Sequence, residues 1–133
     1  MNDIQAPDIA EHVSPLTFDA TIERLVQAIA DRGMTIFARI DHAVNARNAG
    51  MNMPPAMVLI YGDVKTGMPL MLATPLSALD LPLRVLVQER GDGKATVAFH
   101  PIAATLRRAG VVEDDAARVD ELLVAALGLE LPA

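Results

Sequence analysis

The sequence contains no cysteine and no tryptophan, and it has only one tyrosine and three phenylalanines. Without cysteine the chain forms no disulfide, offers no thiolate to zinc and has no cysteine nucleophile. With so few aromatic rings, the core must consist mainly of aliphatic side chains and methionine, and 52% of all residues are hydrophobic. A chain of 133 residues has the usual size of one domain and buries enough surface for an ordinary core.

Positive charge is also scarce. The 11 basic residues face 17 acidic ones, so the formal net charge is −6. This balance opposes nonspecific binding to nucleic acid, which needs basic side chains on phosphates, and adsorption to an anionic membrane. No apolar stretch is long enough to span a bilayer, and residues 1–11 have acids but no basic residue, unlike a secretory signal. We expect a bacterial-type cytoplasmic protein without nucleic-acid or membrane partners.

Hydrophobic periodicity predicts a single α+β domain over residues 10–133, preceded by a flexible arm over residues 1–9. Strands are expected over 11–16, 35–41, 57–61, 83–88 and 95–99. Helices are expected over 17–32, 43–49, 65–73 and 101–108, with a last one beginning at Asp114 or Asp115. This order predicts an antiparallel sheet of about five strands, with helices packed on one face and extra short helices.

Two segments give the clearest local signals. The first helix can be capped by Thr17 and stopped by Gly33. Its apolar residues recur at helical spacing: Ile22, Leu25, Val26 and Ile29. A hairpin is expected at Gly91-Asp92-Gly93, because residues alternate in polarity on both sides of this turn. Pro15 indicates that the first strand lies at a sheet edge or ends there.

The end of the strand over 35–41 holds the candidate catalytic residues. Neighbours in a strand point to opposite faces, so Asp41 and His42 form a close acid–base pair only if the strand ends between them. The simpler interpretation is that Asp41 caps the following helix and His42 bonds to the backbone. Alternatively, His42 is a general base or ligand, because histidine changes protonation near neutral pH, with Asp41, Asp80 or His100 as its partner.

The same alternation places Arg39 on the face opposite the core residues, alongside Phe37. The core side of the strand is expected to hold Ile36, Ala38 and Ile40. An arginine beside an aromatic ring can bind a carboxylate or a phosphate. Pairing with Asp41 or a place in a subunit interface is the simpler interpretation, because arginine and aromatic residues are enriched in interfaces.

Five of the seven methionines fall between residues 51 and 71. Thioethers fill irregular gaps in a core, which is the simpler interpretation, and they also line adaptable binding surfaces. In the second case the methionines would border a concavity between helix and sheet. The candidate ligand-binding methionines are Met53, Met57, Met68 and Met71.

Other chemical signals are weak. The three histidines, His12, His42 and His100, do not have the spacing of a known metal motif, so neither a metal nor a cofactor is expected. His100 precedes a proline at a strand-to-helix junction, where an ordinary loop histidine is common. Gly62 and Gly67 do not match the spacing of a phosphate-binding loop, and the sequence has no nucleophile elbow.

Several motifs together resemble a known family. The run Thr35–Ala43 (TIFARIDHA) is the first of them. The others follow in order: Pro54-Pro55, Ile60-Tyr61-Gly62, Gly67-Met68-Pro69-Leu70-Met71, Asp80-Leu81-Pro82-Leu83 and Asp92-Gly93-Lys94. At these intervals the chain resembles the bacterial and archaeal domain of unknown function family 302, from Pro15 to Leu106.

The resemblance implies a fold like that of the TATA-binding protein, in which a helix packs across a curved antiparallel sheet, and it implies a homodimer. It implies no activity, and it does not bring DNA binding with it, because function resides in sites and not in folds. Two positions depart from the family pattern. Met68 stands where the family usually has threonine, which weakens any site that uses this hydroxyl, and Gln88 stands where an aromatic residue is frequent.

The leading hypothesis is a non-enzymatic, homodimeric module that binds a small, partly apolar ligand or a protein partner. A competing hypothesis is an enzyme with His42 as general base and Asp41 or Asp80 as its partner, which requires a carboxylate within hydrogen-bond reach of His42 at a cleft. A third is a structural or assembly protein without a ligand. The candidate ligand-binding residues are Arg39, His42, Met53, Met57, Met68, Met71 and His100.

Overall fold

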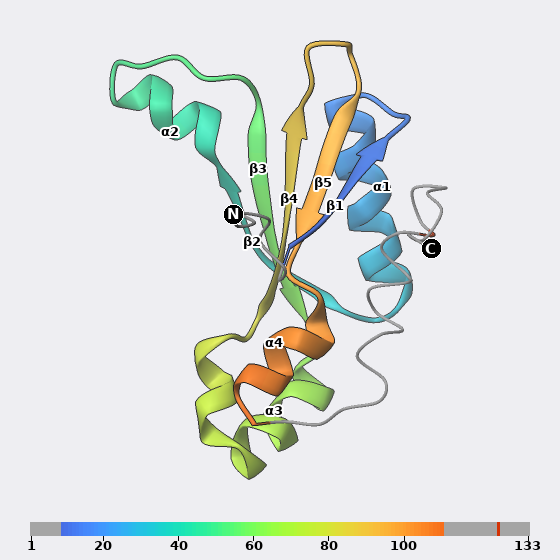
Figure 1. Cartoon of the computed structure of the whole chain (residues 1–133), viewed down its shortest axis with the longest axis vertical. Coiled ribbons are helices and arrows are strands. Elements are labelled where there is room, and N and C mark those ends of the chain that lie inside the picture. The colour runs from blue at the N-terminus through green and yellow to red at the C-terminus, as the bar shows by residue number, and fades with distance from the viewer. Residues whose placement is uncertain (1–8, 111–124, 126–133) are drawn as a thin grey trace, which may run out of the picture.

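The computed structural model describes residues 9–110 and Ala125, with a five-stranded antiparallel sheet at the centre. The strands are β1 (Ala10–Ser14), β2 (Thr35–Asp41), β3 (Ala56–Gly62), β4 (Leu83–Glu89) and β5 (Ala95–Phe99). They lie in the order β1-β5-β4-β3-β2, so β1 and β2 form the edges (Figure 1). The helices are α1 (Phe18–Asp31), α2 (His42–Asn48), α3 (Val64–Ala73), the 3₁₀-helix η1 (Pro75–Leu79) and α4 (Ile102–Arg108). The predicted α+β class is confirmed.

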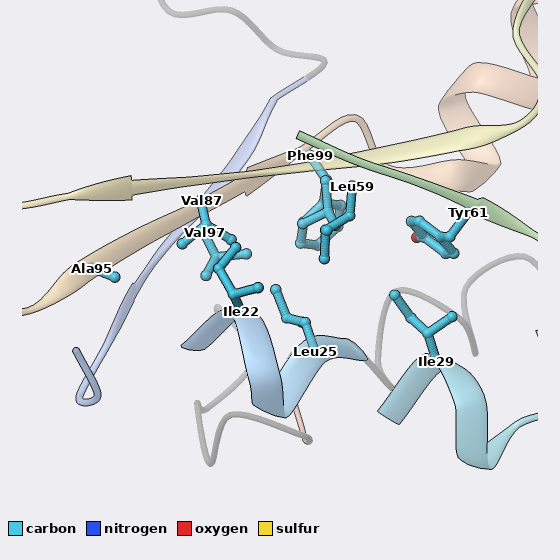
Figure 2. Packing of buried hydrophobic residues seen from close by; sticks show 10 residues of the cluster. Ile22, Leu25, Ile29, Leu59, Tyr61, Val87, Ala95, Val97 and Phe99 are labelled. Atoms are coloured by element: carbon cyan, nitrogen blue, oxygen red, sulfur yellow. The ribbon is translucent and has the colours of Figure 1, made fainter. Parts of the chain in front are cut away.

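One face of the sheet is covered by α1. Leu25 and Ile29 of α1 are fully buried and point toward Leu59 and Tyr61 of β3 (Figure 2). The same cluster contains Ile22, Val85, Val87, Ala95, Val97 and Phe99. Burying one large aliphatic side chain completely contributes roughly 1.5–3 kcal/mol, so this layer is what holds the helix against the sheet.

Local residues set the two ends of α1, as predicted. The Thr17 hydroxyl accepts a hydrogen bond from the Ala20 N–H at 3.2 Å, which satisfies one of the N–H groups that the first turn leaves unpaired. After the last turn, Gly33 has a φ of +75°, a left-handed conformation that only glycine adopts readily. Cap and stop together define the length of the helix.

The predicted hairpin joins β4 to β5. The Arg90 N–H donates to the Lys94 carbonyl at 2.8 Å, and the Asp92 carboxylate accepts from the Lys94 N–H at 3.1 Å. Gly93 has a φ of +84°, which this turn requires. The first strand is confirmed as an edge strand, and it ends at Ser14, immediately before Pro15.

The face assignment predicted for β2 is wrong. The pairing with β3 shifts between Ile36 and Ala38, where a bulge inserts Phe37 as an extra residue. As a consequence Ile36 packs on the helix-covered side and Ala38 moves to the other side. Arg39 pairs with Leu59 and therefore lies on the helix-covered side, at the exposed edge of the sheet, and not on the opposite face.

The face of the sheet away from α1 retains apolar surface. Partner residues in an antiparallel sheet point to the same side, which puts Val58 with Leu86 and Ile60 with Arg84 on this face. The side chains of Val58, Ile60 and Leu86 are half-buried, and Ile40 is exposed. Among the described helices, none lies across this face (Figure 1).

A second layer closes one end of the sheet. Ile102 and Leu106 of α4 are buried against Leu70 of α3 and against Leu81 and Leu83, which lead into β4. This layer lies at the end of the sheet opposite α2 (Figure 1). Of the helices in the described part of the chain, none has the length and apolar character needed to cross a membrane.

Two predicted segments fall outside the described residues. They are most of the arm expected over residues 1–9 and the last helix expected from Asp114 or Asp115 onward. Every other expected strand and helix is confirmed, with boundaries shifted by one or two residues.

Candidate ligand-binding cavity

A cavity of about 210 Å³ lies where α4 meets the end of the sheet. Its apolar lining consists of Pro82, Leu83 and Ile102. Its polar lining consists of Tyr61, Asp80, Arg84, His100, Thr105 and Arg108. These residues come from three separate stretches of the chain, so only the folded domain forms this site.

The strand register explains why these stretches meet. Tyr61, near the end of β3, pairs with Leu83 at the start of β4, and Val85 pairs with Phe99 at the end of β5. In an antiparallel sheet, one strand finishes at the same end of the sheet at which the next strand begins. His100, which follows β5, therefore lies at the same end of the sheet as Tyr61.

The face that α4 turns to the cavity follows from helical spacing. Ile102, Thr105 and Arg108 succeed one another at intervals of three residues, so each is a neighbour of the next along the helix surface. Ile102 and Thr105 are buried, whereas Arg108 is exposed at the end of the helix. The cavity therefore has a buried floor and a basic rim.

The ionisable lining is predominantly basic. Arg84 and Arg108 carry two positive charges and Asp80 carries one negative charge, so the lining is positive by one unit even with His100 neutral. The chain as a whole has a formal net charge of −6. Among the described residues, neither Arg84 nor Asp80 forms a salt bridge.

Two of the residues singled out from the sequence, Asp80 and His100, line this cavity together. His42 does not. It follows Asp41, which pairs with Met57, whereas the cavity begins at Tyr61, four residues or roughly 13 Å further along β3. The structure therefore does not bring His42 together with Asp80 or His100.

Asp41 is engaged in capping. Its carboxylate accepts a hydrogen bond from the Val44 N–H at 3.0 Å at the start of α2. His42 is the first residue of that helix and is half-buried.

His12, the remaining histidine, stacks on Phe99 with ring centroids 6.0 Å apart. In residues 9–110, no group of three or more His, Asp or Glu side chains could hold a metal ion.

The methionines have separate surroundings. Met57 packs against the main core, as expected of a gap-filling side chain. Met53 and Met68 are 41% and 50% exposed, and Met71 is half-buried on α3. None of these four side chains lines the cavity described above.

Four polar lining residues were not singled out from the sequence as site candidates: Tyr61, Arg84, Thr105 and Arg108. The spacing of Thr105 and Arg108 was the one available signal, because it places an arginine and a hydroxyl next to each other on a helix. Arg84 gave no such signal, since a polar residue between two apolar ones is ordinary in a strand.

The chain matches the family model "Domain of unknown function DUF302" over residues 10–128. It is 40% identical over 88 residues to the fluoride-specific ion channel FluC 1 of Brucella suis biovar 1, a match that covers 66% of this chain and 35% of that protein. It is also 40% identical over 88 residues to FluC 2 of Brucella melitensis biotype 1, and this match covers 33% of that protein. The chain thus spans about a third of the length of these relatives.

A solved structure shares the fold. The crystal structure of an uncharacterized conserved DUF302 protein from Bacillus stearothermophilus aligns with a TM-score of 0.79 and 16% sequence identity. The alignment covers 92% of this chain and 98% of that one. The family match over residues 10–128 and this likeness of fold agree: the chain belongs to the DUF302 family of domains of unknown function.

Proposed function

We propose that this chain is a non-enzymatic binding module for a small ligand, which occupies the cavity between α4 and the end of the sheet. The observation that carries this proposal is the composition of the cavity, where the buried residues Ile102 and Thr105 adjoin lining residues with tyrosine, histidine, aspartate and arginine chemistry. Binding sites for small molecules combine apolar surface with polar groups that fix the orientation of the ligand. This cavity contains both kinds of residue, with the polar ones in the majority.

Tyr61 allows a direct test of this proposal. It is the one tyrosine of a chain without tryptophan, and it lines the cavity. Its intrinsic fluorescence therefore reports on the cavity without any label. We expect a panel of small anionic, neutral and cationic metabolites to contain compounds that change this fluorescence and raise the Tm. If no compound of any charge does so, the proposal is overturned.

A blocked cavity provides the control for this screen. Thr105 is buried at the cavity floor, so Thr105→Leu should fill part of the space and abolish the response. Thr96→Leu on β5 is the matched variant, because Thr96 is half-buried on the other face of the sheet and does not line the cavity. Binding should survive in the Thr96 variant, and binding that also survives in the Thr105 variant would contradict a ligand in this cavity.

The module is also proposed to be a homodimer, with the face away from α1 as the contact surface. The apolar side chains of Val58, Ile60 and Leu86, half-buried in the single chain, support this choice. Light scattering after gel filtration should give the mass of a dimer, and Ile60→Glu should reduce it to that of a monomer. Leu72→Glu on α3, at a position 84% exposed, should leave the mass unchanged.

The named relatives favour a second role. Because the matched proteins are called fluoride-specific ion channels, the domain is a candidate accessory unit of an ion channel. Replacing the matched segment of the Brucella suis protein with residues 10–128 of this chain tests the idea. Fluoride efflux from vesicles should be retained after the replacement and reduced after deletion of the segment. Equal efflux in both cases would exclude an accessory role.

A further inference from the structure

The helices α3 and η1 turn apolar side chains to the solvent. They pack against each other at the end of the sheet opposite α2 (Figure 1). We infer that this part of the molecule binds the surface of a lipid bilayer, which goes beyond the proposed function and does not depend on the cavity. The contact surface, called the apolar patch below, consists of side chains that are 45% to 84% exposed: Val64, Met68, Leu72, Leu76 and Leu79.

Helical spacing places the exposed residues of α3 on one side of this helix. Val64, Met68 and Leu72 follow one another at intervals of four residues, so they are neighbours along the helix surface. Leu70 lies two residues from both Met68 and Leu72, which puts it on the opposite side, where it packs against α4. The fold therefore already uses one apolar side of α3, and the apolar patch is a second one.

The polarity of η1 is the reverse of that of an ordinary surface helix. Its serine, Ser77, is fully buried, and the Ser77 hydroxyl donates a hydrogen bond to the Thr74 carbonyl at 2.6 Å. Its two leucines, Leu76 and Leu79, are 74% and 81% exposed. Exposed apolar side chains that gather in one region mark a site of contact with a protein or a membrane.

The charges of this segment favour a membrane over a protein. Residues 64–79 contain one charged residue, Lys65, and no acid, although 21% of the whole chain is charged. Lys65 is exposed in the first turn of α3, and a lysine can lay its carbon chain on apolar surface while its ammonium group contacts a lipid phosphate. The aromatic residues and arginines that are enriched in protein interfaces do not occur in this segment.

The leucines of the apolar patch also suit a fluid partner. Leu72, Leu76 and Leu79 are each at least 74% exposed, so their side chains project from the protein surface. A protein partner needs a matching hollow for each projecting side chain, whereas acyl chains rearrange around it. The formal net charge of −6 opposes electrostatic adsorption to an anionic membrane, but it does not oppose the insertion of apolar side chains into an uncharged one. We therefore expect binding to phosphatidylcholine.

Co-sedimentation of the full chain with sucrose-loaded phosphatidylcholine vesicles tests this inference. Leu72, Leu76 and Leu79 together have nearly as many side-chain carbon atoms as a myristoyl chain, which binds membranes reversibly with a constant of about 10⁴ M⁻¹. Half of the protein should therefore bind at roughly 0.1 mM accessible lipid, and less should bind when phosphatidylserine replaces part of the phosphatidylcholine. No binding at about 10 mM lipid, or binding that rises with phosphatidylserine, would overturn the inference.

Glutamine variants locate the contact. Leu76→Gln and Leu79→Gln should each weaken vesicle binding by about 10-fold or more, because each removes one leucine side chain from the lipid. Both positions are exposed, so the folded domain should be retained. Val44→Gln is the matched control, because Val44 is 39% exposed on α2 at the opposite end of the sheet (Figure 1). Unchanged binding in both leucine variants would show that the apolar patch is not the contact surface.

A tryptophan in the apolar patch reports the contact directly. The chain has no tryptophan, so Leu76→Trp and its control Val44→Trp each emit from a single indole ring. We expect phosphatidylcholine vesicles to move the emission of the Leu76→Trp protein to shorter wavelength and to leave that of the Val44→Trp protein unchanged. If the emission of the Leu76→Trp protein moves with protein concentration and not with vesicles, the apolar patch contacts another protein molecule and the inference is wrong.

Discussion

The hydroxyl groups of Ser14 and Thr21 hydrogen-bond to each other at 2.8 Å, although both side chains are fully buried. Ser14 is the last residue of β1, and Thr21 lies in the first turns of α1. The Ser14 hydroxyl also accepts a hydrogen bond from the Leu16 N–H at 3.1 Å. This small polar network fixes the edge strand to the helix that covers the core.

We predict that Thr21→Val destabilises the domain by about 1–3 kcal/mol, because the Ser14 hydroxyl then loses a partner in a buried place. Valine has nearly the shape of threonine, so the change removes the hydroxyl and leaves the packing. Urea unfolding followed by circular dichroism measures the loss.

A double-mutant cycle isolates the pair. Because each single variant leaves one buried hydroxyl without its partner, Ser14→Ala combined with Thr21→Val should cost less than the sum of the two single changes. The expected coupling lies in the range of about 0.5–3 kcal/mol found for residues in contact. Additive costs would show that the bond does not contribute to stability.

Leu59 and Leu72 have the same side chain but differ in how much of it is buried, so a comparison of the two measures the effect of burial. Leu59 is fully buried between α1 and the sheet, whereas Leu72 on α3 is 84% exposed. We predict that Leu59→Ala lowers the free energy of unfolding by about 2–5 kcal/mol, through lost burial and a residual cavity. Leu72→Ala should change it by less than about 0.5 kcal/mol. A similar loss in both variants would mean that a partner covers Leu72 in solution.

Local signals in the sequence were sufficient for most of the fold. The cap at Thr17, the glycine at 33 and the turn at 91–93 each act through backbone groups a few residues away. Such interactions are determined by neighbouring residues, and for that reason the sequence predicts them well.

The bulge at Phe37 depends on the partner strand and has no local signal. Alternation alone put Ile36 and Ala38 on one face, but the register with β3 separates them. A bulge is defined by two residues opposite one on the neighbouring strand, so the sequence of one strand does not reveal it. The error carried over to Arg39, whose face was inferred from the same alternation.

The cavity required long-range information for the same reason. Arg84 and Arg108 belong to different elements, and they line one cavity because α4 packs against Leu70, Leu81 and Leu83. Asp80 and His100 were recognised as residues with functional chemistry, but their partner was sought in His42. Sequence chemistry therefore identified Asp80 and His100, and tertiary packing brings them to one cavity with the other lining residues.

The cap of α2 tests the structural interpretation of Asp41. Its carboxylate accepts from the Val44 N–H at 3.0 Å. We predict that Asp41→Ala costs about 0.5–2 kcal/mol, while Asp41→Asn costs little, because asparagine is an equally good cap. Thermal unfolding of both variants measures the difference. If alanine and asparagine were equally destabilising, the negative charge and not the cap would be what matters at this position.

Asp92 gives a prediction about pH. The Lys94 N–H donates to its carboxylate, and this hydrogen bond, with a smaller effect of the Arg90 charge, lowers the pKa of Asp92 below its usual value of 3.8. A carboxyl group whose pKa is lower in the folded state stabilises that state above its unfolded pKa. The contribution is lost as the pH falls through the folded pKa, hence below about pH 4. A carbon-detected NMR titration should place the midpoint of Asp92 below 3.8.

Variants of the turn separate the two causes. Arg90→Gln removes the salt bridge of 3.3 Å between Arg90 and Asp92 but keeps the Lys94 N–H, which is the largest single cause, so the pKa of Asp92 should stay below its usual value. Lys94→Ala keeps the same N–H and removes only a side-chain charge, so it serves as the matched control. If Arg90→Gln returned the midpoint of Asp92 to the value of an unfolded peptide, the charge of Arg90 and not the backbone hydrogen bond would control this group.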